Sequence, residues 1–566
     1  MAAGKNSGHK PVSDPDPKSG FCKRTETYYS LRPSVTPPAS GLAPSVADAI
    51  FSSLVSSRFS SGTALIDPST DERISFAQLA DYVQSLADFL SALGLRKGES
   101  VLVICPNYIY VPIVYLSVLS VGAVLTASNP ASTAHDVSYQ CRLSKPVLAV
   151  LHSSTVHLAP KSLPHPPIII DSPHFIALLK PDRQKPVHNV SAEQGGRPRM
   201  VRTRSDIRPD DPATILYSSG TTGRIKGVLL THRNYTAMLA ASSGRWAERE
   251  AAGTGLLTVP MFHIYGFFFI LNAVAVGETT VVLSRFSMGS MLQAVEKYRV
   301  NYIAAAPPVV VLMAKSEMAG QYDLSSLVVV GSGGAPLGKD VIDRFTARFP
   351  QVEIVTGYGL TESTGGITSL MGPEETKRHG SAGKLAANVE AKIIDPESGA
   401  ALPPGKQGEL WLRGEPIMKG YVNDDEATSS TLHPEGWLKT GDLCYFDEEG
   451  FLFVVDRLKE LIKYKGYQVA PADLEHLLHG HPEIADVAVI PYPDEEAGQV
   501  PMAFVVRQPN SRLTEAQVMA FVAEKVAPYK RVRRVAFVSS IPKNAAGKIL
   551  RKDLAKLALP TPPSRL

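Results

Sequence analysis

Short apolar, β-branched runs alternate with helix-like segments along most of the chain from Ser45 onward. The spacing of apolar positions predicts helices over 287–298 and 338–349, whereas the β-branched runs are short and continuous, as in fully buried strands. Alternation of strand and helix predicts an α/β fold with parallel sheets. The runs that we expect to form buried strands are 101–105, 147–151, 168–170, 258–259, 279–283, 302–305 and 327–330.

The pattern changes after about residue 387. Three shorter strands separated by turn residues follow, which is typical of antiparallel, barrel-like structure: AKIID (391–395), GELWLRG (408–414) and GFLFVVD (450–456). Beyond residue 456 the pattern predicts a compact α+β unit of about a hundred residues. Its expected elements are a helix at 471–478, strands at 485–490 and 502–506, and a helix at 514–525.

These changes divide the chain into four segments. Residues 1–44 are polar and rich in proline and serine, so we expect a mostly disordered leader, and they lack the apolar core of a secretory signal. Residues 45–456 form the expected N-terminal domain and 457–559 the C-terminal domain. Residues 560–566 form an exposed tail.

Composition narrows the classes of function. The 566 residues are 44% hydrophobic and 20% charged, with a net charge of +4, which does not favour a nucleic-acid or membrane partner. The most apolar stretch, 111–126, carries serines and stops at Asn129-Pro130, so we expect a buried helix running into a strand and no membrane span. The four cysteines have no CxxC spacing, which indicates a reducing compartment without a disulfide framework or a cysteine metal site.

One loop has the composition of a phosphate site. Residues 218–227 read SSGTTGRIKG and follow the apolar run 213–217. Its glycines, hydroxyls and lysine can surround a phosphate with backbone N–H groups, donors and a cation. Counting from Gly220, however, Ile225 occupies the second glycine position of a Walker A motif, and Gly227 follows the lysine. Alone, the stretch leaves a phosphate site and an ordinary Ser/Gly turn equally open.

Downstream motifs favour a nucleotide site. GYGLTE (357–362) follows an apolar run. A strand and then a glycine turn at 357–359 would place a hydroxyl and a carboxylate at the carboxyl end of the strand, where open α/β sheets bind ligands. A carboxylate beside phosphates suits Mg²⁺. GWLKTGD (436–442) is expected to place an acid in a glycine turn, suited to paired ribose hydroxyls. Basic motifs follow at 456–459, 463–468 and 542–548.

In order and spacing, these motifs resemble the adenylate-forming superfamily of acyl-CoA synthetases, firefly-type luciferases and peptide-synthetase adenylation domains. The resemblance covers about 45–554 and is closest to plant 4-coumarate:CoA ligase and its peroxisomal relatives. The segments that carry the closest likeness are PMFHIY (260–265), PP (307–308), GGAPL (333–337) and KELIKYKGYQVAP (459–471).

The resemblance implies an α/β fold: a large N-terminal domain of two doubly wound sheets plus a small β-barrel, then a mobile α+β C-terminal lid. It also implies a two-step reaction. A carboxylate attacks the α-phosphorus of MgATP to give acyl-AMP and pyrophosphate, and the CoA thiol then displaces AMP. No protein nucleophile is needed, so catalysis is positioning and charge stabilisation.

Site residues follow from the same resemblance. The implied catalytic residues are His263, Thr361, Glu362 and Lys548, with Glu362 as the Mg²⁺ ligand. The implied ATP and AMP contacts are Ser218, Ser219, Gly220, Thr221, Thr222, Lys226, Gly334, Ala335, Gly357, Tyr358, Thr361, Asp442, Arg457, Lys459, Lys463, Gln468 and Lys548. CoA is expected at Arg285, Lys465 and Gly466, and the acyl group at His263, Tyr265 and Gly365.

The lid is expected to rotate about Lys459 between the two half-reactions. One pose delivers Lys548 to the carboxylate and α-phosphate, and the other brings 465–467 in to form the pantetheine tunnel. His263 could be a satisfied core histidine, but its place after PMF favours a wall of the acyl pocket.

Three departures from the family pattern bear on substrate choice. Arg224-Ile225 stands where many relatives have proline before the lysine, and Thr356 replaces a glutamine before GYG. After Glu362 the chain reads STGGI, where 4-coumarate ligases have Gly-Pro-Val, so we expect a differently shaped acyl site. Hydroxycinnamate-like, cinnamate-like or related aromatic acids are the leading substrates, and benzoate derivatives stay open among them. Medium- or long-chain fatty acids and jasmonate-precursor cyclopentanone acids are the alternative.

Other functions remain open. A luciferase-like oxygenase shares the fold, whereas carrier loading and mere nucleotide binding fit the motifs less well. The sequence predicts ATP, CoA and a carboxylic acid as small-molecule partners. The terminal Ser564-Arg565-Leu566 is a variant of the S-K-L address, so we also expect a peroxisomal import receptor as partner and a peroxisomal location.

Overall fold

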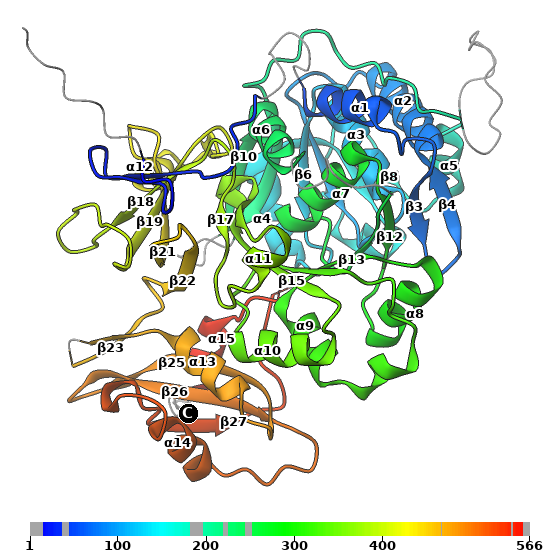
Figure 1. Ribbon diagram of the computed structural model, residues 1–566. Coiled ribbons are helices and arrows are strands. Elements are labelled where there is room, and N and C mark those ends of the chain that lie inside the picture. Colours follow the sequence, from blue (N-terminus) through cyan, green and yellow to red (C-terminus); the bar gives the residue numbers. More distant parts are fainter. Residues whose placement is uncertain are drawn as a thin grey trace, which may run out of the picture.

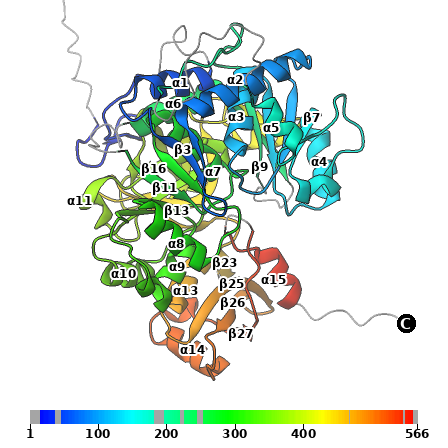
Figure 2. The same ribbon diagram turned by 90° about the vertical axis from the view of Figure 1, so that its right-hand side faces the viewer.

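The computed structural model describes residues 15–36, 45–180, 196–218, 225–243, 252–465, 467–544 and 547–558. Within these residues, three sheets and their helices form a large body, and a fourth sheet forms a smaller body below it (Figures 1 and 2). Along the chain, α/β elements come first, antiparallel strands second and an α+β unit last, in the order that the sequence predicts.

The first large sheet has seven strands and is mostly parallel. Its order is β20 (Gly420–Tyr421), β10 (Lys226–Thr231), β9 (Pro212–Ser218), β6 (Val124–Ser128), β5 (Ser100–Ile104), β7 (Pro146–Leu151) and β8 (Ile168–Ile169). The antiparallel β9–β10 pair sits at one side of the parallel strands. Helices α4 (Ala134–Ser144) and α5 (Pro173–Leu178) and the short turn Ser153–Leu158 connect these strands.

The second large sheet has nine strands. Its order is β17 (Lys384–Leu385), β16 (Gly365–Ser369), β15 (Glu353–Leu360), β14 (Val329–Ser332), β13 (Tyr302–Ala305), β11 (Thr254–Leu257), β12 (Thr279–Val282), β3 (Thr63–Asp67) and β4 (Glu72–Ser75). One apolar cluster joins this sheet to helices α8 (Met288–Tyr298), α9 (Pro307–Lys315) and α10 (Lys339–Arg348) on one face.

The main core lies between the two large sheets. Buried strand residues of both sheets, such as Val101 and Leu257, belong to one cluster with helices α1 (Val46–Ser56), α2 (Phe76–Ala92), α3 (Val111–Ser120) and α7 (Ile264–Val276). All ten residues of α3 are buried, and the chain runs from it into β6, as predicted for 111–126. Among the described residues no helix is both long and apolar enough for a bilayer crossing. Helix α6 (His232–Ser243) follows β10 beside α7.

The third sheet is antiparallel and contains part of the expected leader. Its order is β1 (Phe21–Cys22), β2 (Thr27–Tyr29), β18 (Glu390–Ile394), β19 (Gly408–Arg413), β21 (Leu438–Phe446) and β22 (Leu452–Arg457). We expected residues 1–44 to be mostly disordered, and this was wrong for 15–36. Tyr28 is 1% exposed and stacks on Phe446, so a buried aromatic ring fixes the β1–β2 hairpin to the sheet. Short helices α11 (Gly372–Thr376) and α12 (Asp425–Thr431) complete this region.

The smaller body, which we call the lid, follows β22. Its sheet has the order β24 (Tyr467–Val469), β23 (Ile462–Tyr464), β26 (Gly498–Arg507) and β25 (Ile484–Asp494), with β27 (Arg534–Phe537) beside β26. Helices α13 (Pro471–His479) and α14 (Glu515–Ala523) pack on its own apolar core, and α15 (Arg551–Ala558) on a smaller cluster. In both views the lid lies against the end of the body that carries α9 and α10 (Figures 1 and 2).

Two differences from the sequence-based elements concern strand ends. The strand expected at 258–259 lies earlier, at β11, and its hydrogen bonds to β12 and β13 fix that register. The expected glycine turn at 357–359 is part of β15, because Gly357 and Gly359 allow β16 to approach closely. A Cβ on Gly359 would lie 1.9 Å from the carbonyl oxygen of Gly365.

Candidate functional site

The two ends of the predicted phosphate loop lie beside the predicted metal ligand. Ser218 ends β9 and Lys226 begins β10, and the two residues are paired across the hairpin. The Ser218 hydroxyl donates a hydrogen bond of 2.9 Å to Oε1 of Glu362. The intervening predicted contacts Ser219, Gly220, Thr221 and Thr222 lie outside the described residues.

Tyr421 completes this group, and the sequence motifs did not point to it. Its hydroxyl donates to Oε1 of Glu362 at 3.0 Å, and the Lys226 ammonium lies 4.5 Å from its ring centroid. Burial and the nearby carboxylate raise the pKa of the Tyr421 phenol. The neutral hydroxyl of Tyr421, the ammonium of Lys226 and the carboxylate of Glu362 therefore lie together where β9 ends and β10 begins.

Glu362 is held by the turn that follows β15. Residues Thr361–Ser363 form one short helical turn, in which the Ser363 hydroxyl accepts a hydrogen bond of 2.9 Å from the Leu360 N–H. Thr361 is buried. The backbone carbonyl of Glu362 accepts from the Met418 N–H at 2.9 Å. This turn at the carboxyl end of β15 agrees with the position predicted for the hydroxyl and the acid.

Asp442 is a buried carboxylate on β21, and it is contacted by Tyr358 and Arg457, which belong to two other sequence motifs. The Tyr358 hydroxyl donates to its Oδ2 at 2.6 Å, and the Arg457 guanidinium lies 3.4 Å from its Oδ1. Burial raises the pKa of Asp442, while Arg457 and the hydrogen bond from Tyr358 oppose the rise. The acid lies within a strand and not in the glycine turn that we expected.

Lys548 lies near this acid although it belongs to the lid. The carboxylates of Asp442 and Glu460 are close enough to raise the pKa of its ammonium, but burial and the neighbouring Arg457 prevail and lower it to about 8. Lys548 therefore lies within electrostatic reach of Asp442 and Arg457, and the two expected lid poses stay predictions.

The loop that carries Lys548 is held by two hydrogen bonds between Lys548 and Asn544. The Lys548 N–H donates to Oδ1 of Asn544 at 2.9 Å, and its carbonyl accepts from the Asn544 N–H at 2.8 Å. Lys543 forms an isolated bridge with Ile549, and its ammonium donates to Asp486 at 2.7 Å. The loop is thus braced on β25 before it reaches the body.

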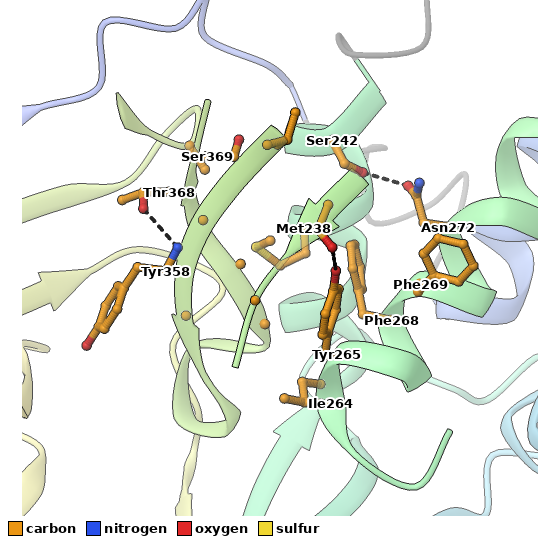
Figure 3. A pocket seen from close by; sticks show the side chains of 18 of the residues that line it. Met238, Ser242, Ile264, Tyr265, Phe268, Phe269, Asn272, Tyr358, Thr368 and Ser369 are labelled. Atoms are coloured by element: carbon orange, nitrogen blue, oxygen red, sulfur yellow. Dashed lines mark hydrogen bonds between the residues drawn. The ribbon is translucent and has the colours of Figure 1, made fainter. Parts of the chain in front are cut away.

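A cavity of about 210 Å³ adjoins Tyr358. One wall is the face of α7 that carries Tyr265, Phe268 and Phe269, and the opposite wall is formed by β14, β15 and β16 (Figure 3). The Tyr265 hydroxyl donates to the Gly331 carbonyl at 3.0 Å, which ties the two walls together. The glycines that line this cavity are Gly331, Gly333, Gly334, Gly357, Gly359, Gly365 and Gly366.

His263 lines the same cavity and also caps α7. His263 is the N-cap residue of α7, and its Nδ1 accepts a hydrogen bond of 3.3 Å from the N–H of Tyr265 in the first turn. Burial lowers the pKa of His263 to about 4, so the ring is neutral at pH 7. An accepting Nδ1 assigns the proton to Nε2, on the basis of the hydrogen bond.

Other predicted site residues lie elsewhere. Gly334 lines the cavity and Ala335 follows it, whereas Arg285 is exposed just after β12. Lys459 lies in the connection between β22 and β23. Lys463 and Gln468 are paired on the β23–β24 hairpin of the lid, where both are exposed, as is Lys465. Gly466 lies outside the described residues. Their assignments to nucleotide or CoA stay predictions.

Comparison with known families and relatives agrees with this arrangement. Residues 55–422 match the model of the AMP-binding enzyme family, and residues 473–548 match the AMP-binding enzyme C-terminal domain. The chain is 46% identical to "4-coumarate--CoA ligase-like 9" of Arabidopsis thaliana over 97% of its length and 98% of the relative. It is 48% identical to "Peroxisomal OPC-8:0-CoA ligase 1" of the same plant, over 96% and 98%.

Solved structures give the same result. An anthranilate CoA ligase, AuaEII, in complex with anthranoyl-AMP superposes with a TM-score of 0.80 at 26% identity, over 91% of this chain and 98% of that one. The o-succinylbenzoate CoA synthetase of Bacillus subtilis, in complex with its acyl-adenylate intermediate, gives 0.75 at 26%, over 90% and 98%. The chain belongs to the AMP-binding enzyme family and is an ATP-dependent carboxylic acid:CoA ligase that acts through an acyl-AMP intermediate.

Proposed function

We propose that the acid activated by this ligase is a planar aromatic acid of the cinnamate or hydroxycinnamate class. The observation that carries the proposal is the form of the cavity beside Tyr358. Aromatic side chains of α7 face strands that are rich in glycine, so the space between them is a slot with apolar walls (Figure 3). A flat conjugated ring stacks in such a slot with little loss of conformational entropy.

The nucleotide is assigned to the surface between Glu362 and Asp442. Asp442 and Arg457 hold the ribose, Tyr358 and Gly334 flank the adenine, and Lys226 and the loop after Ser218 hold the β- and γ-phosphates. The pairing of Ser218 with Glu362 and of Tyr358 with Asp442 supports these roles, because it joins both ends of the nucleotide site to β15.

The residues also fit Mg²⁺. Mg²⁺ takes few protein oxygens and is bound mainly through substrate phosphates. The described residues hold no cluster of three or more potential metal-ligating acids, histidines or cysteines, and Glu362 offers one carboxylate beside the phosphate loop. Glu362 would hold the ion, which neutralises phosphate charge when bound.

In the first half-reaction a carboxylate oxygen of the acid attacks the α-phosphorus and pyrophosphate leaves. Lys548 approaches from the lid and neutralises charge that develops on the acid and the α-phosphate. Thr361 contacts the α-phosphate. Nδ1 of His263 already accepts from the Tyr265 N–H, so the ring orients the carboxylate as a donor through Nε2. In the second half-reaction the CoA thiol attacks the acyl carbon and AMP leaves.

A second acid class has its own support. The cavity continues along α7 past the aromatic residues to Asn272, Ala273 and Glu278, which gives length for an aliphatic chain. One relative is named an OPC-8:0-CoA ligase, which supports a fatty or cyclopentanone acid.

A luciferase-like oxygenation predicts O₂-dependent light and an adenylate that CoA does not consume.

A screen of acids separates these substrates. The purified enzyme is given ATP, Mg²⁺ and CoA with cinnamate, 4-coumarate, benzoate, octanoate or palmitate, and CoA-dependent release of AMP is measured. The proposal expects the highest kcat/KM for the cinnamates. A preference for octanoate or palmitate by tenfold or more would overturn it and favour the aliphatic class.

Peroxisomal location is also a proposal. It rests on the relative named peroxisomal and on the tripeptide Ser564-Arg565-Leu566, which lies outside the described residues. A fluorescent protein carrying residues 555–566 is expected to reach peroxisomes. The same fusion without the last three residues is expected to remain diffuse, and equal behaviour of the two would contradict the proposal.

A further inference from the structure

Asp456 crosses the boundary between the body and the lid. It lies on β22, the last strand of the body's third sheet, and is paired with Leu443 of β21. The next strand, β23, already belongs to the sheet of the lid. Any change in the relative orientation of the two bodies must therefore be taken up between residues 458 and 461, and Asp456 stays with the body.

The carboxylate of Asp456 nevertheless binds a helix of the lid. Its Oδ2 accepts a hydrogen bond of 2.9 Å from the N–H of Ala472, in the first turn of α13. The N-cap residue of α13, Ala470, has no side chain that could accept this bond, and Pro471 follows it. The N–H groups in the first turn of a helix have no intrahelical partners. The helix dipole also stabilises a negative charge at this end.

Strand alternation explains why this acid faces the lid. Arg457, the next residue on β22, is directed to Asp442 in the nucleotide site, so Asp456 projects from the other face of the strand. Asp456 is 6% exposed, which makes the loss of its partner costly. Burial raises its pKa to about 6, with Arg551 and two backbone N–H groups opposing the rise, so it is ionised at pH 7.

The side chain of Arg551 connects the helix that Asp456 caps to the loop that carries Lys548. Arg551 lies three residues after Lys548, and its guanidinium binds Glu460 at 2.8 Å, Glu475 at 3.1 Å and the Val489 carbonyl at 2.9 Å. Glu475 is on α13, the helix that Asp456 caps. Arg551 therefore joins the Lys548 loop to α13, and Asp456 holds both from the body.

We propose that Asp456 is a positioning residue that caps α13 across the boundary and thereby stabilises the lid pose that brings Lys548 to the nucleotide site. The inference rests on the proposed role of Lys548 in acyl-AMP formation. Rotation of the lid about residues 458–461 breaks the bond between Asp456 and Ala472. The cap therefore favours the first half-reaction and makes no contribution to the second.

A cysteine pair measures the pose without reference to catalysis. A Cβ placed on Gly338 would lie 3.4 Å from Cβ of His476, near the separation found in disulfides, and these residues belong to the body and the lid. The disulfide of a Gly338→Cys/His476→Cys enzyme therefore forms in this pose. Its rate of formation under a mild oxidant reports how often the lid occupies the pose.

The test makes three further substitutions, each in the Gly338→Cys/His476→Cys enzyme and in the enzyme without these two cysteines. Asp456→Ala removes the cap, Asp456→Asn keeps an oxygen acceptor, and Asp473→Ala removes an acid in the same turn whose partner, Lys530, lies within the lid. Loss of a cap predicts a fall of about 2- to 30-fold in disulfide formation and in acyl-AMP formation for Asp456→Ala. Thioester formation from supplied acyl-AMP is expected to stay unchanged, with Asp456→Asn intermediate and Asp473→Ala near the parent.

Three results would overturn the inference: an unchanged rate of disulfide formation in Asp456→Ala, an equal loss in both half-reactions, or the same selective loss in Asp473→Ala. Failure of the proposed role of Lys548 is distinguishable. In that case Asp456→Ala still slows disulfide formation, whereas Lys548→Ala leaves acyl-AMP formation intact.

Discussion

The hydroxyl of Ser218 donates a hydrogen bond of 2.9 Å to Glu362, 144 positions further along the chain. This bond joins the hairpin of the first large sheet to the carboxyl end of β15 in the second, so the proposed nucleotide site lies where two sheets meet. Tyr421, on the edge strand β20, donates to the same carboxylate oxygen. Three elements thus hold one carboxylate beside the phosphate loop.

Glu362→Gln is expected to lower kcat/KM for MgATP by about 10²-fold, because the substitution removes the carboxylate charge and keeps the shape. The steady-state rate of AMP release at varied Mg²⁺ measures this, and higher Mg²⁺ is expected to recover part of the loss. Glu353→Gln, at the other end of β15, is the control and is expected to have the parent rate. A parent-like rate for Glu362→Gln would contradict the assigned site.

Lys548→Ala is expected to slow acyl-AMP formation by at least about 10²-fold and to spare thioester formation from supplied acyl-AMP. The reason is that Lys548 meets the nucleotide site only in the pose described here. Rapid-quench measurement of each half-reaction separates the two rates. Lys556→Ala, in the exposed part of α15, should alter neither, and an equal loss of both half-reactions in Lys548→Ala would refute the role.

The pH dependence of the first half-reaction should follow Lys548. Its pKa is lowered to about 8, so the free enzyme holds the cation below that pH and loses it above. We expect kcat/KM for MgATP to fall as the pH rises through about 8, since this parameter reports groups of the free enzyme. In Lys548→Arg the cation persists, so the residual activity should show no such fall up to pH 10. A fall at the same pH in both enzymes would assign the titration to another group.

The two glycines after Thr364 are expected to differ in their tolerance of a side chain. Gly365 has φ +105° and faces Ile264 and Phe268, at 3.8 and 3.9 Å from an added Cβ, whereas Gly366 has nothing within 4 Å. Gly365→Ala therefore strains the backbone and narrows the slot, and we expect KM for the acid to rise about tenfold with KM for ATP unchanged. Gly380→Ala is the control for backbone strain, because Gly380 has φ +86°, nothing within 4 Å of an added Cβ and no place in the lining of the cavity. Equal KM values in both variants would argue against a slot bounded by Gly365.

His263 has two separable roles. His263→Ala removes the cap of α7 and is expected to cost about 1 kcal/mol of stability as well as activity. Asn is a good capping residue, so His263→Asn should keep the melting temperature of the parent and lose only acid recognition. Thermal unfolding and KM for the acid are measured together. A parental KM in His263→Asn would show that the ring does not contact the substrate.

Much of the fold follows from local patterns. β13 lies at 302–305 as predicted, and α8 begins one residue after the start of the expected segment because Ser287 caps it. Buried parallel strands are continuous apolar runs, which makes them visible in sequence. The β1–β2 hairpin was missed because its strands have two and three residues, too few for a periodic signal, and burial of Tyr28 against Phe446 stabilises it from 418 positions away.

The site was predictable where a motif is contiguous. Contiguous motifs pointed to Ser218, Glu362, Asp442 and Lys548. In the structure Ser218 is hydrogen-bonded to Glu362, and Asp442 is close enough to Lys548 to influence its pKa. Tyr421, Arg551 and Asp456 were not assigned, since their roles depend on which distant strand or helix each one meets. His263 was found by its motif, but its capping bond required the start of α7 to be known.

The central claim is that the acid is activated as its adenylate. The most direct measurement uses the acid that performs best in the screen, labelled with ¹⁸O in its carboxylate, and follows the label by mass spectrometry after turnover with ATP and CoA. Attack of the carboxylate on the α-phosphorus predicts one ¹⁸O atom in the released AMP and none in the pyrophosphate. Unlabelled AMP with ¹⁸O in the pyrophosphate, or ADP with ¹⁸O in orthophosphate, would contradict the account.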